Sequence, residues 1–273
     1  MSTPIDSQFR SLPLPARGVE HHYGDRVFLH SFPYPISLLT RLSSPATVQP
    51  LFNSILRDLY GFLLGQVAGL ELPRVTVEQP TRMAAINPEA VLHTQVIDPR
   101  RRVIVVDVAR AGILPSALFF DGLCALLDPS SVRQDHIFMN RRTNEKGEVI
   151  GVDMSGSKIG GPVDGQIVII PDPMGATGSS MLRAMQHYRE KNTGAPLRFV
   201  SVNLIVTPKY VKRLVAEAPD VTIHALRLDR GLSSQAVLDL PPGASEDERG
   251  LNAEDYIVPG AGGVGELINN ADH

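Results

Sequence analysis

A chain of 273 residues is long enough for one large α/β domain or two small ones, because domains usually contain about 100–200 residues. With 26 Lys and Arg against 29 Asp and Glu, the formal net charge of −3 excludes any general electrostatic attraction to nucleic acid or to an anionic membrane. No run approaches the ~18 consecutive apolar residues of a membrane span, the polar start MSTPIDSQFRS is unlike a signal peptide, and the single Cys124 cannot form an internal disulfide, so we expect a soluble cytoplasmic protein.

Residues 1 to about 45 are rich in proline and histidine and show little periodicity, so we predict an extended N-terminal arm ahead of a single domain over residues 46–273. Residues 47–70 instead favour an amphipathic helix. The apolar residues that share one face of this helix are Leu51, Ile55, Leu59, Phe62 and Leu63. The Leu-Pro pair that follows ends the helix, because a residue before proline disfavours the helical conformation.

Short runs rich in β-branched residues alternate with helical patterns over the rest of the chain. The predicted strands are residues 74–78, 102–108, 166–170, 198–206 and 220–226. The predicted helices are residues 113–127, 178–191 and 208–218. The three central strands are nearly continuous apolar, as expected of strands that are covered on both faces. The pattern predicts an α/β fold with a doubly wound, mostly parallel sheet, in which ligands bind beyond the carboxyl ends of the strands.

The stretch VIIPDPMGATGSSM, residues 168–181, passes from an apolar strand through Asp172 into small and hydroxyl-bearing residues that open a helix. Small residues let backbone N–H groups converge on an anion at a helix N-terminus, and a carboxylate can accept hydrogen bonds from a ribose diol. The stretch lacks the G-K-[ST] of a triphosphate loop and the G-x-G-x-x-G of a dinucleotide fold. We therefore interpret it as a ribose 5-phosphate site and not as an ordinary turn between a strand and a helix.

The segment IIPDPMGATGSS at 169–180 resembles the phosphoribosyl pyrophosphate (PRPP) loop of the uracil phosphoribosyltransferases. Other segments match the same family in the same order: ARAGILP at 109–115, MNRRTNE at 139–145, SKIG at 157–160, VTIHALRLDRGL at 221–232 and ERGLNAEDYIVPGAGGVGE at 248–266. The resemblance extends from about residue 30 to 268. It implies a type I phosphoribosyltransferase fold with a β-hairpin flap.

The resemblance also implies a reaction, in which uracil N1 is joined to C1 of PRPP to give UMP and pyrophosphate in pyrimidine salvage. Mg²⁺ would be carried by the pyrophosphate, without direct protein ligands. The implied PRPP-binding residues are Arg110, Arg141, Arg142, Asp172, Pro173, Met174, Gly175, Ala176, Thr177, Gly178, Ser179 and Ser180. The loop would hold the 5-phosphate, and an arginine fork can bind pyrophosphate oxygens through two parallel hydrogen bonds. The implied catalytic residues are Asp172, Arg110 and Glu266.

The base site is expected in an extended segment whose backbone groups can read the two carbonyls and one N–H of uracil. Its residues are Tyr256, Ile257, Val258, Gly260, Ala261, Gly262 and Gly263. The family typically continues G-D-x-G-D, whereas this chain has Gly263 at the first aspartate and Glu266 at the second. Residues 233–251 form an insert, acidic with two adjacent prolines, that we predict to be an exposed loop beside the base site.

Two kinds of function fit these observations. The first is a phosphoribosyltransferase for uracil or for a different base, and the second is a non-catalytic PRPP- or nucleotide-binding regulatory protein on the same fold. The first is favoured because the phosphate-side residues are all present, whereas Gly263 and the insert favour the second. Either way we expect small-molecule partners, neither nucleic acid nor membrane, and, from the resemblance, a homodimer or higher homo-oligomer.

Overall fold

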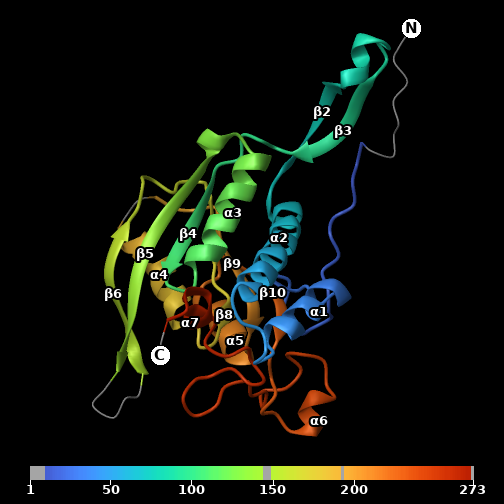
Figure 1. The fold of residues 1–273 in the computed structure, drawn as a ribbon. Helices are drawn as coiled ribbons and strands as arrows, with labels where there is room; N and C mark the ends of the chain where they lie inside the picture. Colours follow the sequence, from blue (N-terminus) through green and yellow to red (C-terminus); the bar gives the residue numbers. More distant parts are fainter. Residues whose placement is uncertain (1–9, 144–148, 192–193, 272–273) are drawn as a thin grey trace.

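The computed structural model describes residues 10–143, 149–191 and 194–271, apart from the side chains of residues 140–152. An eight-stranded sheet forms its centre (Figure 1). The strands are β1 (Val27–Leu29), β4 (Val103–Ala109), β5 (Val132–Thr143), β6 (Val149–Lys158), β7 (Ile167–Pro171), β8 (Met174–Gly175), β9 (Arg198–Val206) and β10 (Val221–Leu228). They lie in the order β1-β10-β9-β7-β4-β5-β6, with β8 beside β9; the described pairs are parallel except for β5 with β6.

Helices cover both faces of this sheet. One face packs against α1 (Pro33–Leu42), α2 (Leu51–Glu71), α3 (Ile113–Leu126) and α7 (Val264–Asn269). The other face packs against α4 (Ser179–Glu190) and α5 (Pro208–Glu217). The remaining helices are α6 (Gln235–Leu238) and the short 3₁₀ segments η2 (Arg82–Ala85) and η3 (Pro129–Ser131). No helix among the described residues combines the length and the apolarity that a bilayer crossing requires.

The near-continuous apolar strands are explained by two separate cores. Side chains alternate along a strand, so Val103 and Val105 pack toward α2 and α3, whereas Ile104 and Val106 pack toward α4 and α5. These four side chains are fully buried. The doubly wound, mostly parallel α/β fold predicted from the sequence is therefore confirmed.

The N-terminal arm differs from the prediction over residues 27–42. Strand β1 pairs in parallel with β10 at the edge of the central sheet, and α1 packs its buried Leu39 and Leu42 into the core. Neither element has a clear sequence pattern, because β1 has only three residues and α1 opens with Pro33 and Pro35. Residues 10–26 are largely irregular, as expected of an arm.

Two hairpins lie outside the parallel part of the sheet. The predicted strand at 74–78 does not join the central sheet: β2 (Arg74–Pro80) pairs with β3 (Val91–Ile97) in a separate antiparallel ribbon that projects at the top of Figure 1. At the sheet edge, β5 and β6 form the expected β-hairpin.

Candidate active site

A cavity of about 1060 Å³ opens where β4 and β7 end, at the carboxyl edge of the sheet. Residues 108–111, at the end of β4 and directly after it, form one wall, and residues 176–183, from the loop into α4, form another. The segments 255–257 and 262–266 complete the rim. The cavity thus brings together three segments that lie far apart in the sequence and that the sequence analysis assigned to pyrophosphate, ribose phosphate and base.

The predicted phosphate loop, residues 175–180, packs closely against α4 and α5. Gly178 has a φ of +81°, and a Cβ there would come within 2.7 Å of a Leu214 methyl carbon, so glycine is required. α4 begins at the next residue, which leaves its first N–H groups at the cavity. Thr177, Ser179 and Ser180 line the cavity, and the Thr177 Oγ1 and Ser179 Oγ lie 3.2 Å apart. The loop therefore presents hydroxyls and N–H groups to an anion.

Pro173 and Gly175 support the loop from the side that faces away from the cavity. The Pro173 carbonyl accepts the N–H groups of Leu204 and Ile205 at 3.0 and 3.1 Å, and the Gly175 carbonyl accepts the N–H of Thr207 at 3.0 Å. Neither Pro173 nor Gly175 is among the described residues that line the cavity. Their place is to bind the loop to β9 and to the start of α5.

Asp172 stands on the wall between the phosphate loop and β4. Its backbone N–H donates to Val202 O at 2.9 Å, and Asn203 Nδ2 donates to its carbonyl at 2.7 Å. Its Oδ1 accepts the Met174 N–H at 3.2 Å. Burial raises the pKa of the Tyr210 phenol, and the Asp172 carboxylate adds to that shift, so the phenol stays neutral beside the carboxylate. Asp172 is thus held in place by β9 while its carboxyl group reaches the cavity.

Arg110 and Glu266 meet across the cavity. Arg110 Nη2 lies 3.3 Å from Glu266 Oε1, and both side chains line the wall. α7 comes close to the residues after β4, because a Cβ on Gly265 would lie 3.2 Å from the Cβ of Ala111. The Arg110 side chain is 52% exposed and that of Glu266 29%, so this pair is screened by water and easily exchanged for another partner.

The base segment is fixed at Val258 and Gly260. Val258 N–H donates to Gly250 O at 2.9 Å and Val258 O accepts the Gly231 N–H at 3.0 Å. Gly260 N–H donates to Asp229 Oδ2 at 2.7 Å, and Arg227 donates to Gly260 O at 3.0 Å. Val258 and Gly260 therefore use their backbone groups within the protein, and neither is among the described residues that line the cavity.

The rest of the base segment is more open. Tyr256, Ile257, Gly262 and Gly263 line the cavity, whereas Ala261 is 8% exposed and lies behind it. The N–H groups of Gly262 and Gly263 have no hydrogen-bond partner within the described residues. Both N–H groups can therefore be presented to the carbonyls of a ring.

The cavity also contains cations that the sequence did not single out. Arg213 of α5 donates from Nη1 to Ser179 Oγ at 2.8 Å and to Thr177 O at 3.3 Å. Lys209 and Arg183 line the same wall. These three residues belong to no sequence motif that would indicate a role in binding. Only the packing of α4 and α5 shows that they lie at the cavity. The predicted Arg141 and Arg142 lie in β5, and their side chains fall outside the described part of the structure.

Comparison with known proteins shows the family and the fold. A family model described as uracil phosphoribosyltransferase matches residues 33–246. The uracil phosphoribosyltransferase of Pyrococcus furiosus is 26% identical over 86% of this chain and 85% of its own, and that of Pyrobaculum islandicum is 30% identical over 74% and 82%. The solved structure of the AQ2163 protein from Aquifex aeolicus aligns with 89% of this chain and 97% of its own, with a TM-score of 0.65 at 21% identity, which shows a shared fold. This chain belongs to the uracil phosphoribosyltransferase family.

Proposed function

We propose that the chain transfers the phosphoribosyl group of PRPP to uracil and so makes UMP and pyrophosphate in pyrimidine salvage. The observation that supports this most directly is the single cavity shared by the phosphate loop, Asp172, Arg110 and the base segment. A reaction that joins two substrates in line needs such a shared cavity, because most of its acceleration comes from positioning and charge stabilisation. The family membership supports the same reaction.

In this proposal the loop residues 177–180 hold the 5-phosphate through hydroxyls and N–H groups. Asp172 accepts the ribose hydroxyls and faces the positive charge that develops on the ribose as the C1–O bond to pyrophosphate breaks. Arg110 binds the pyrophosphate. The guanidinium forms stronger, bidentate bonds to phosphate oxygens than the single 3.3 Å contact to Glu266, so pyrophosphate binding releases Glu266.

Glu266 then takes the proton that uracil N1 loses as the N1–C1 bond forms. Gly263, at the position of the family's first aspartate, has no side chain for this task, and Glu266 is the carboxylate of α7 that lines the cavity. The Asp172 carboxylate lines the same cavity, and Mg²⁺ that keeps its pyrophosphate and water ligands fits beside this negative charge. When bound, Mg²⁺ would offset the charge on the leaving pyrophosphate.

The alternative is a regulatory protein that binds PRPP without turnover. Gly263 favours it, because general acid–base assistance is typically worth about 10²–10⁴-fold in rate and one candidate carboxylate is missing. A transferase for a different base is the third possibility, since the base is read by few backbone groups.

The test is product formation from PRPP and Mg²⁺ with uracil, and with cytosine, hypoxanthine and orotate in parallel reactions. We expect UMP from uracil. Turnover with another base alone would correct the substrate, and PRPP binding without turnover of any base would support the regulatory protein. Asp172→Asn serves as the control, since it removes the carboxylate and keeps the size of the side chain.

A further inference from the structure

The insert at residues 233–251 is less free than the exposed loop predicted from the sequence. Most of its side chains are exposed, but its two ends are tied to each other. Leu232 N–H donates to Arg249 O at 3.0 Å, and Arg249 N–H donates to Ser233 Oγ at 2.8 Å. The insert is therefore a closed loop whose two ends, residues 230–233 and 248–250, are joined by hydrogen bonds. We call these two ends the neck.

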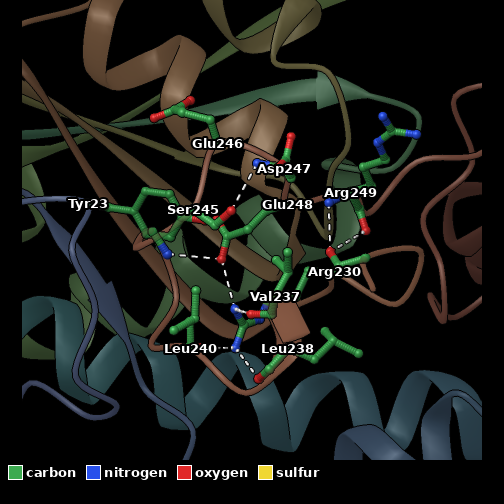
Figure 2. A network of polar contacts seen from close by, with 12 residues as sticks. Tyr23, Arg230, Val237, Leu238, Leu240, Ser245, Glu246, Asp247, Glu248 and Arg249 are labelled. Atoms are coloured by element: carbon green, nitrogen blue, oxygen red, sulfur yellow. Dashed lines mark hydrogen bonds and ion pairs between the residues drawn. The ribbon is translucent and has the colours of Figure 1, made fainter. Parts of the chain in front are cut away.

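A buried ion pair lies inside this neck (Figure 2). Arg230 Nη1 and Glu248 Oε1, which we call the neck pair, are 2.9 Å apart, and the Glu248 side chain is fully buried. Arg230 Nη1 also donates to the carbonyl of Val237, and Nη2 donates to the carbonyls of Leu238 and Leu240, all in the insert. The Glu248 carboxylate accepts the Gly243 N–H at 3.0 Å and the hydroxyl of Tyr23, from the N-terminal segment. One arginine and one glutamate thus bind both halves of the insert.

The neck connects directly to the base segment. Gly231, next to Arg230, donates its N–H to Val258 O at 3.0 Å, and Gly250, two residues after Glu248, accepts the Val258 N–H at 2.9 Å. Val258 is therefore held between the two ends of the insert. Gly250 approaches so closely that a Cβ there would lie 2.0 Å from Asp229 O.

We propose that Arg230 and Glu248 are positioning residues for the base. They fix the two ends of the insert, the ends fix Val258, and Val258 sets where residues 256–263 stand over the cavity. This inference deepens the proposed function and rests on it, because the base site is the one assigned there. It assigns the insert a task in base affinity, whereas PRPP binds to a different wall of the cavity and does not depend on the neck.

The test compares two glutamates of the insert that differ in burial. Glu248 is buried in the neck, whereas Glu246, two residues earlier, pairs with Lys212 at 2.8 Å and its side chain is 92% exposed. Glu248→Ala should lower kcat/KM for uracil by about tenfold or more, mainly by raising the KM, since a shift of about 1 Å in a substrate-positioning segment can cost about 100-fold. The Kd for PRPP should stay within about twofold. Glu246→Ala should leave both constants unchanged, and the conservative Glu248→Gln should recover part of the loss.

A merely structural role gives a different pattern. Loss of folded protein lowers the apparent kcat, leaves both KM values unchanged, and affects PRPP and uracil alike. An unchanged KM for uracil in folded Glu248→Ala would overturn the inference. Should that variant fail to fold, Tyr23→Phe removes only the hydroxyl that binds Glu248 and carries the same test with a smaller expected rise.

Hydrogen–deuterium exchange separates this inference from the proposed function. If the wild-type protein turns over no uracil, the proposed function fails, but the neck still predicts faster exchange at the amides of Val258 and Gly260 in Glu248→Ala than in Glu246→Ala. Equal exchange in the two variants would overturn the inference on its own.

Discussion

At the scale of single residues, phosphate binding by the proposed loop depends on which hydroxyl hydrogens are not used in hydrogen bonds within the protein. Gly178 turns the chain with a positive φ, and Thr177 and Ser179 stand on either side of it with their hydroxyls 3.2 Å apart. Ser179 Oγ also accepts from Arg213. Because a hydroxyl has two acceptor sites and one hydrogen, this pattern leaves the Ser179 hydrogen available to a phosphate oxygen.

Thr177→Phe should abolish PRPP binding, because a phenyl ring would fill the space where the 5-phosphate is proposed to lie. Isothermal titration calorimetry with PRPP and Mg²⁺ measures this directly. Thr40→Phe, at an exposed position of α1, is the matched control and should bind as the wild type does. Unchanged binding in Thr177→Phe would show that the phosphate lies elsewhere.

Glu266→Gln should lower kcat by roughly 100-fold, the lower end of the usual contribution of general acid–base catalysis, with little change in the KM for PRPP. Gly263→Asp should restore part of that rate in the double variant. The backbone permits the change, since Gly263 has a φ of −77° and is the N-cap of α7, a position that aspartate favours. Steady-state kinetics of the four proteins checks both effects; a Glu266→Gln enzyme with full turnover would remove Glu266 from the proposed mechanism.

At the scale of elements, α5 contributes a charge to a loop that belongs to α4. Arg213→Gln should weaken PRPP binding by about tenfold, because a hydrogen bond to a charged group contributes about 1.5–3 kcal/mol and the glutamine keeps only a neutral donor. Its effect on the KM for uracil should be small. Arg189→Gln is a suitable control, since Arg189 pairs with Asp220 at 2.6 Å and does not line the cavity. Competition binding against PRPP distinguishes the two.

A second element-scale feature is the buried histidine pair between β1 and β10. His30 Nε2 lies 3.0 Å from His224 Nδ1, and His224 Nε2 lies 2.8 Å from Glu71 Oε1 of α2, which also pairs with Arg198. Burial, and then the neighbouring His224, lower the pKa of His30 to about 3. The pKa of Glu71 is lowered in spite of its burial, because His224 and Arg198 stabilise the carboxylate.

The sign of the pH effect follows from the His30 shift. The unfolded chain binds a proton at His30 near its ordinary pKa of 6.5, whereas the folded chain resists it down to about 3. This contribution is complete above pH 6.5 and is lost as the pH falls toward 3, by up to about 1.4 kcal/mol of unfolding free energy per pH unit. His30→Gln should therefore flatten the stability profile between pH 6.5 and 4.5, while His22→Gln, at an exposed position, should not. Urea unfolding at several pH values measures it, and parallel slopes in all three proteins would contradict the assignment.

At the scale of the whole molecule, the cavity joins segments from across the chain, so a ligand that fills it should stabilise the complete fold. PRPP with Mg²⁺ at 100 times its Kd should add about 2.7 kcal/mol to the unfolding free energy. Uracil alone should add little, because its few backbone contacts leave most of the cavity unfilled. Thermal unfolding with and without each ligand tests this, and equal shifts for both would contradict the proposal that PRPP fills most of the cavity. The homodimer remains a prediction that light scattering can check against the 29.7 kDa chain.

The sequence predicted the molecule best where structure is local. β-branched runs located β4, β7, β9 and β10, and the small residues of 175–180 located the turn that leads into α4. It failed where partners are distant: nothing near β1 indicates its pairing with β10, and nothing near Arg213 indicates the loop that it contacts. Val258 and Gly260 were predicted to face the base, but their backbone groups are taken by Gly231, Gly250 and Asp229, which only the folded chain reveals.

The pairing of β1 with β10 also bears on how the protein is made. His30 and His224, which are in contact at this edge of the sheet, are 194 residues apart in the sequence. Tyr23 and its partner Glu248 are 225 residues apart. At roughly 5–20 residues per second, a ribosome needs on the order of ten seconds or more to supply the partner of the first strand. The first strand to leave the ribosome is therefore among the last to be joined, and its buried Val27, Phe28 and Leu29 stay uncovered during most of synthesis.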